Sequence, residues 1–260
     1  MVERLIDVED VVGSNPASPT YNMDVKIIYE NNDVLVVDKP AGIVVFPEGE
    51  SVKSGEKTLI DVMIERYPKL AEVGLPPRYG IVHRLDKDTS GILLVAKSTE
   101  ALIFLQKQFK NREVDKKYVC LVQGIIKEDI GRIETLIGRA PGDKRKQKAY
   151  SLSENGPGKR EAVTEYKVLE RFEDYTLLQV KMLTGRRHQI RCHFSYLQHP
   201  LAGDKLYSFK NAKNPKGLTR QFLHAKYLKI NLPDGKTKEF QSNLPEDLEN
   251  VLKNLKKYDN

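Results

Sequence analysis

A continuous apolar segment, residues 92–97, restricts the fold of this chain more than any other feature. Its residues lack the polar alternation of a half-exposed strand, so both faces of the segment must be buried. No run in the chain approaches the roughly 18 consecutive apolar residues that a membrane span requires. The segment directly follows a polar loop, residues 81–91, that ends in glycine. We therefore predict a buried strand that holds this loop in a fixed position.

The rest of the chain mixes strand-like and helix-like patterns. Further strands are expected at residues 25–30, 34–38, 117–122, 163–171, 175–183, 222–232 and 236–241. Helices are expected from Leu59 to about Tyr67, after Ser98 through Phe109, over residues 187–198, and over residues 248–255. Strands and helices do not alternate regularly, which favours an α+β fold over a doubly wound parallel sheet.

Composition excludes several classes of protein. The chain has 43 Lys and Arg residues against 36 Asp and Glu, a net charge of +7, which suits a polyanionic partner without establishing one. The two cysteines, Cys120 and Cys192, are too few for a disulfide scaffold or a cysteine-built zinc site. His188 and His193 are five residues apart, which misses the spacing of a helical zinc pair. With no signal-peptide pattern, we expect a reduced, cytoplasmic protein that holds no metal.

The loop before the buried strand carries the most reactive side chains. Asp86 and Asp88 both offer carboxylates, and a loop fixed to a rigid strand can hold a catalytic group accurately. The alternative is a charged turn in which Asp and Ser side chains bond only to the local backbone. The residue types alone leave both interpretations open.

The motif His83-Arg84-Leu85-Asp86, followed by Thr89-Ser90-Gly91, closely resembles the signature of the RluA family of pseudouridine synthases. Other blocks resemble that family in the same order: Lys39-Pro40-Ala41-Gly42, Lys117-Tyr118, Thr184-Gly185-Arg186-Arg187-His188-Gln189-Ile190-Arg191, His199-Pro200-Leu201-Ala202-Gly203-Asp204 and Leu223-His224-Ala225. Gln198 and Arg187 depart from the family's usual Gly and Thr, and neither is an expected catalytic position. The resemblance extends from about residue 27 to residue 225.

The resemblance implies a pseudouridine synthase fold with a mixed, largely antiparallel central sheet and flanking helices, in which residues 92–97 form a central strand. It also implies that the enzyme isomerises uridine in structured RNA, ribosomal or transfer, with Asp86 as catalytic aspartate and no cofactor. A carboxylate can attack the sugar or the base, or remove a proton from C2′ of the ribose. These three roles remain open.

The resemblance assigns roles to further residues. Arg191 would bind Asp86, and Tyr118 would stack on the flipped uracil and help remove its C5 proton, so both join Asp86 as catalytic residues. Because Arg187 and Arg191 are four residues apart, a shared helix would place them on one face. Substrate binding is expected of His83, Arg84, Arg186, His188, Lys144 and Arg145, with Arg84 filling the space that the uridine vacates. The basic segment 139–148 either follows RNA phosphates as a flexible flap or is a solvated loop.

Residues 1–22 are expected to lie outside the fold, as a disordered extension or as translated sequence upstream of a true start at Met23. Residues 23–260 would then form one catalytic domain, monomeric, without the S4-type RNA-binding domain of many relatives. A non-catalytic RNA-binding module would share the basic charge. The distance between Asp86 and Arg191 separates the two hypotheses, because only the enzyme requires them in contact.

Overall fold

The computed structural model describes residues 25–48 and 55–258. In this part of the chain, ten strands form one sheet in the order β1-β2-β3-β9-β4-β8-β7-β5-β6, and β10 pairs with β9. The strands are β1 (Lys26–Glu30), β2 (Val34–Lys39), β3 (Ser90–Ala96), β4 (Asp115–Gln123), β5 (Ile130–Arg139), β6 (Gln147–Tyr150), β7 (Arg160–Arg171), β8 (Tyr175–Met182), β9 (Leu223–Asn231) and β10 (Thr237–Gln241). Their pairings are antiparallel except for that of β3 with β9. The predicted α+β fold with a mixed, largely antiparallel sheet is confirmed.

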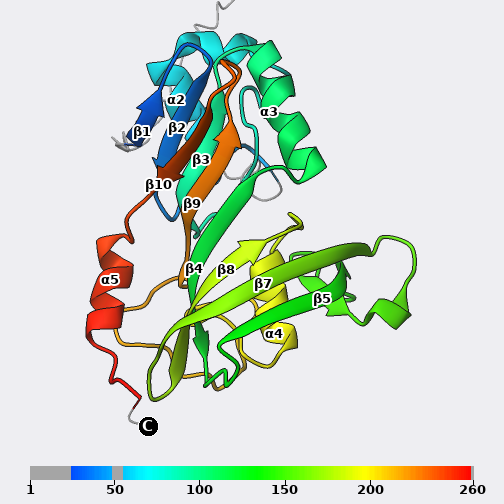
Figure 1. Ribbon diagram of the computed structural model, residues 1–260, viewed down its shortest axis with the longest axis vertical. Coiled ribbons are helices and arrows are strands. Elements are labelled where there is room, and N and C mark those ends of the chain that lie inside the picture. The colour runs from blue at the N-terminus through cyan, green and yellow to red at the C-terminus, as the bar shows by residue number, and fades with distance from the viewer. Residues whose placement is uncertain (1–24, 49–54, 259–260) are drawn as a thin grey trace, which may run out of the picture.

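The helices cover the two halves of this sheet. They are α2 (Leu59–Arg66), α3 (Thr99–Asn111), α4 (Gln189–Tyr196) and α5 (Glu246–Lys253). Figure 1 shows α2 and α3 beside β1, β2 and β3 in the upper half, and α4 behind β7 and β5 in the lower half. Ser98 caps α3, as its position predicts, by accepting a hydrogen bond of 3.1 Å from the backbone N–H of Ala101.

Residues 92–96 of the apolar segment lie in β3, and all seven residues of this strand are buried. It lies between β2 and β9, so it is an interior strand as predicted. It is not the middle strand, because β4 occupies the centre of the path and β3 is third from one edge. The sequence could not indicate this, since β9 comes from the far end of the chain and inserts between β3 and β4.

The parallel contact between β3 and β9 is short and depends on Gly91. The two strands pair only at Ser90↔His224 and Gly91↔Ala225. Gly91 has φ of +113°, and a Cβ atom at this position would lie 2.3 Å from the carbonyl oxygen of Ala225. Only glycine permits this approach. The loop that carries Asp86 is therefore fixed where the two halves of the sheet meet.

The basic segment 139–148 forms the end of a β-hairpin that the sequence did not predict, with residues 140–146 as its turn. β5 and β6 pair from Leu136↔Tyr150 to Arg139↔Gln147, so the segment is the end of a β-hairpin. The lysines and arginines of this segment mask the alternation of apolar and polar residues that is typical of strands, so the sequence indicated only a loop. Among the described residues, no helix is long and apolar enough to cross a membrane. The expected extension, residues 1–22, lies outside the described residues.

Candidate active site

Asp86 lies on the loop before β3, in a turn closed by a 3.0 Å hydrogen bond from the N–H of Thr89 to its carbonyl oxygen. Its Oδ2 atom accepts a hydrogen bond of 2.9 Å from Nη1 of Arg191. The two side chains are 17% and 8% exposed, so the ion pair is largely shielded from water. The contact between Asp86 and Arg191, which the enzyme hypothesis requires and the binding-module hypothesis does not, is therefore present in the structure.

Arg191 is itself held by a second carboxylate. Its Nε and Nη2 atoms donate to the two oxygens of Asp204, at 2.6 Å and 2.9 Å. The Asp204 side chain is completely buried. This bidentate geometry fixes the plane of the guanidinium group and leaves Nη1 directed at Asp86. Asp204 belongs to a motif that resembles the RluA family, but the sequence alone indicates no role for it.

The start of α4 differs from the prediction. His188 has φ of +55°, in the left-handed region, and the helix begins only at Gln189. Arg187 therefore precedes the helix, and the prediction that Arg187 and Arg191 share one helix face is wrong. The reason is the buried side chain of Gln189, whose Oε1 accepts from Thr184 Oγ1 at 2.7 Å and from the Arg186 N–H at 3.0 Å. These bonds hold residues 184–188 as a loop.

The charges around Asp86 favour its ionised form. Burial raises the pKa of this carboxyl, but His188, Arg191 and Arg84 lower it further than burial raises it, so the pKa lies below its ordinary value. Oδ1 of Asp86 lies 3.8 Å from Nε2 of His188. Asp86 is therefore a carboxylate at neutral pH, with one oxygen bound to Arg191 and the other facing an imidazole.

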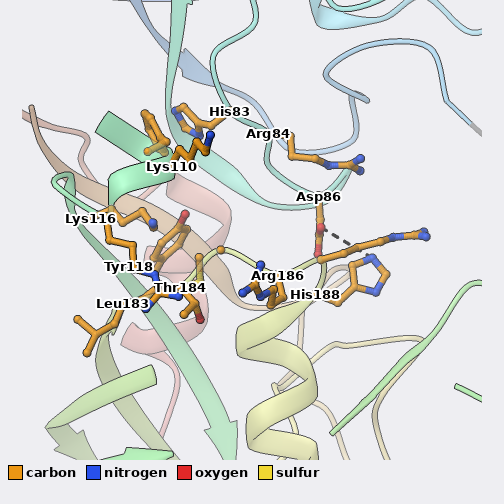
Figure 2. Close-up of a pocket in the computed structure, with 15 residues that line it drawn as sticks. His83, Arg84, Asp86, Lys110, Lys116, Tyr118, Leu183, Thr184, Arg186 and His188 are labelled. Atoms are coloured by element: carbon orange, nitrogen blue, oxygen red, sulfur yellow. Dashed lines mark ion pairs between the residues drawn. The ribbon is translucent and has the colours of Figure 1, made fainter. Parts of the chain in front are cut away.

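Asp86 and Tyr118 line the same recess, which has a volume of about 490 Å³. Figure 2 shows that they enter it from different sides, Asp86 from the loop before β3 and Tyr118 from β4. Burial and the nearby Asp86 raise the pKa of Tyr118, so its hydroxyl keeps its proton at neutral pH. A planar ring could enter between the carboxylate and this tyrosine.

Two of the expected substrate-binding residues are engaged with the protein. Arg84 forms an ion pair with Glu48, and its guanidinium carbon lies 5.4 Å from the centre of the Phe46 ring. His83 accepts a 3.2 Å hydrogen bond from the Leu94 N–H and stacks on Phe109, with 4.7 Å between ring centres. Burial, with a contribution from Lys116, lowers the pKa of His83 to about 3. His83 is therefore a neutral side chain that fixes the loop to β3.

The other four expected substrate-binding residues border hollows around Asp86. Arg186 and His188 line the same recess as Asp86 and Tyr118. Lys144 and Arg145, at the tip of the β5–β6 hairpin, line an adjoining hollow of about 780 Å³ that also contains Asp86. The structure thus brings the hairpin and the Asp86 loop to one groove, although they are more than 50 residues apart in sequence.

Lys39 also supports the loop, a role that was not predicted from the sequence. Its side chain is fully buried, and Nζ donates to the carbonyl oxygens of Pro40, Ile43 and Lys87 at 2.8, 2.9 and 2.9 Å. Burial lowers the pKa of Lys39 to about 7, against the opposing effect of Asp86 and Asp88. A charged residue within a strand is the signal that could have indicated such a role, since buried lysines need partners.

We expect Lys39→Met to lower the free energy of unfolding by about 3 kcal/mol, because the buried carbonyl oxygen of Ile43 and the partly buried ones of Pro40 and Lys87 each lose a hydrogen bond. Urea denaturation measures this change. Lys26→Met, at an exposed position of β1, is the control and should change stability by less than about 0.5 kcal/mol. Equal effects of the two substitutions would show that Lys39 does not hold the loop.

No cluster of three or more His, Cys, Asp or Glu residues that could bind a metal ion occurs among the described residues. Among the residues that line the recess are a carboxylate, a phenol, imidazoles, guanidinium groups and the ammonium groups of Lys110 and Lys116. This set can bind, orient and attack a substrate, or move protons.

Comparison with known proteins gives consistent matches. The family model for RNA pseudouridylate synthase matches residues 33–196. The chain is 41% identical over 236 residues to an uncharacterized RNA pseudouridine synthase of Bacillus subtilis, covering 90% of this chain and 74% of that protein. It is 38% identical over 239 residues to ribosomal large subunit pseudouridine synthase D of Vibrio cholerae, covering 87% and 69%. The structure of human RNA pseudouridylate synthase domain containing 1 superposes with a TM-score of 0.72 at 28% identity, covering 90% of this chain and 89% of that one.

Proposed function

Because the chain belongs to the RNA pseudouridylate synthase family and is an RNA pseudouridine synthase, we propose that Asp86 is its catalytic carboxylate and ribosomal large-subunit RNA its substrate. The choice of RNA is supported by relatives named as ribosomal large subunit pseudouridine synthase D. The observation that carries the catalytic assignment is the shielded 2.9 Å contact between Asp86 and Arg191 at the edge of a recess. Residues 23–260 would act as one catalytic unit, monomeric and in the cytoplasm, where ribosomal RNA is found.

The reaction breaks the bond between N1 of uracil and C1′ of ribose, and forms a bond from C5 of the same base to C1′. The proton on C5 is lost and N1 gains one, so no group is transferred and no redox change occurs. Asp86 would attack the sugar or the base, or take a proton from C2′. All three roles require an ionised carboxylate, which the lowered pKa of Asp86 provides.

The uracil would lie between Asp86 and Tyr118. Tyr118 keeps its proton, so stacking on the base is the role that its pKa supports. To reach the recess, the uridine must leave its stack in the RNA, at a cost of a few kcal/mol. Arg84 would offset part of this cost. Its side chain would leave the ion pair with Glu48 and fill the space that the uridine vacates.

A basic surface leads from the recess along the hairpin and supports RNA as the partner. A further hollow of about 560 Å³ adjoins it and is lined by Arg139, Lys159, Arg160, Arg186 and Arg187. No carboxylate is among the described residues that line this hollow. Like charges held close together repel one another. Burial lowers the pKa of Arg186, and repulsion from the neighbouring Arg160 and Arg112 lowers it further. Phosphate groups would relieve this repulsion.

Neutralising the hairpin tip, with Lys144, Arg145 and Lys146 all changed to Ala, should weaken RNA binding and reduce its dependence on salt. Each lost phosphate contact lowers the slope of log K against log salt by about 0.7, so the slope should fall by about 2. Single-turnover chemistry at saturating RNA should change little. Filter binding between low and moderate salt measures the slope.

The matched control changes Lys253, Lys256 and Lys257 to Ala. Lys253 ends α5 and the other two follow it, and Figure 1 shows α5 on the other side of the molecule from β5. If both triple variants lower the slope equally, the hairpin makes no particular contact with RNA.

Pseudouridine mapping in cells with and without this protein tests the proposed substrate. We expect one or more pseudouridines of large-subunit ribosomal RNA to disappear in its absence. Loss confined to transfer RNA would replace the proposed substrate. An unchanged map in both RNAs would contradict the proposal.

A further inference from the structure

The turn that follows Asp204 connects both neighbours of Asp86. Oδ1 of Asp204 accepts hydrogen bonds from the backbone N–H groups of Leu206 and Tyr207 at 2.9 and 3.0 Å, in addition to its bond with Arg191. The Tyr207 hydroxyl lies 3.0 Å from Nδ1 of His188. One short turn thus holds Arg191 through Asp204 and His188 through Tyr207.

The direction of the hydrogen bonds at Tyr207 can be deduced. Its oxygen accepts a bond of 2.7 Å from the backbone N–H of Gln147, the first residue of β6. The hydroxyl proton of Tyr207 is then free to be donated to Nδ1 of His188. The opposite arrangement would give Nδ1 the proton and turn the lone pair of Nε2 towards the Asp86 carboxylate, which is repulsive.

We propose that Tyr207 is a positioning residue that fixes His188 with its proton on Nε2, directed at Oδ1 of Asp86. The inference rests on the proposed role of Asp86. It adds that this carboxylate is oriented through both oxygens, by Arg191 at Oδ2 and by His188 at Oδ1. It also links the turn end of the β5–β6 hairpin, through the N–H of Gln147, to the catalytic carboxylate.

The protonation states of both rings agree with this arrangement. Burial lowers the pKa of His188 to about 4; Asp86 and Asp204 oppose this, while Arg191 and Arg187 add to it. Burial raises the pKa of Tyr207. At neutral pH, His188 is therefore a neutral imidazole with a single N–H, and Tyr207 retains the proton that it donates.

The remaining gap is the 3.8 Å between Nε2 of His188 and Oδ1 of Asp86, which is longer than a hydrogen bond. Hydrogen bonds at catalytic groups commonly shorten when substrate fills the site. A nucleotide in the recess would remove water from this contact, and the fixed Nε2 proton would then limit rotation of the carboxylate.

Tyr207→Phe tests the proposal with little change in packing. The ring stays, together with its contacts to the guanidinium carbon of Arg191 at 5.1 Å and to the His188 ring at 5.7 Å between centres. We expect the single-turnover rate to fall about tenfold, the effect of losing one hydrogen bond, with RNA affinity unchanged. Tyr196→Phe, at an exposed position of α4, is the matched control and should retain the full rate.

The position of the histidine proton is a readout that a purely structural role would not change. In ¹⁵N spectra of histidine-labelled protein, His188 should show a protonated Nε2 and an unprotonated Nδ1, with the signals assigned by their loss in His188→Gln. In Tyr207→Phe, the two forms should become mixed. Protonated Nδ1 in the unchanged protein, or an equal rate in Tyr207→Phe and Tyr196→Phe, would overturn the proposal. Because the spectra need no RNA, they test this inference even if the proposed catalytic role of Asp86 fails.

Discussion

Asp86→Asn is expected to reduce pseudouridine formation by about 10⁴-fold or more. The substitution keeps the shape of the side chain but removes the charge that pairs with Arg191 and the carboxylate that attacks or accepts a proton. Because this carboxylate acts on the reacting atoms, the loss should appear in single-turnover rates at saturating RNA. Chemical labelling of pseudouridine in the product RNA measures it.

RNA binding should respond differently to the same substitution. Affinity should stay within about twofold of the unchanged protein, since phosphate contacts supply most of the binding free energy. Asp88→Asn is the matched control, because it removes a carboxylate from the same loop without touching Arg191. If Asp88→Asn abolishes turnover and Asp86→Asn does not, the catalytic assignment within this loop is wrong.

Asp204→Asn is expected to lower the free energy of unfolding by about 3–5 kcal/mol. Asp204 is completely buried and binds Arg191 through both oxygens. Arg191 would keep its ion pair with Asp86. An amide at position 204 can accept through one oxygen only, so Arg191 would lose a charge-assisted hydrogen bond and keep a buried donor without a partner, which is more costly than losing an exposed ion pair. The rate should fall as well, because Arg191 would no longer be held towards Asp86. Guanidinium denaturation followed by circular dichroism measures the stability.

Glu239→Gln is the control for Asp204→Asn. Glu239 pairs with Lys229 at 2.7 Å, but both side chains are about half exposed, so its loss should change stability by less than about 1 kcal/mol. A comparable loss for the two variants would show that the buried hydrogen bonds of Asp204 stabilise the protein no more than an exposed ion pair does.

The sequence contained the local information for much of this structure. The apolar pattern of β3 and the polar loop before it predicted a buried strand with Asp86 at its entrance, and both are present. The resemblance to the RluA family indicated the partner of Asp86, and the structure brings Arg191 to it. These features depend on residues close in sequence or on a motif.

Features that depend on distant contacts were not predictable. The position of β9 between β3 and β4 is set by pairing between ends of the chain more than 130 residues apart. The late start of α4 is set by the buried contacts of Gln189, and helix periodicity does not report them. The role of Tyr207 could not be predicted, because the sequence around a single loop tyrosine does not indicate what its hydroxyl contacts.

This protein isomerises uridine in RNA, and we attribute the reaction to the Asp86 carboxylate. The most direct test is the release of tritium from ribosomal RNA labelled at C5 of uridine, with the purified protein and its Asp86→Asn variant compared at equal concentration. We predict that the unchanged protein releases tritium in proportion to the pseudouridine formed, and that the variant releases none above background. Release by Asp86→Asn at the rate of the unchanged protein would contradict the assignment of the reaction to Asp86.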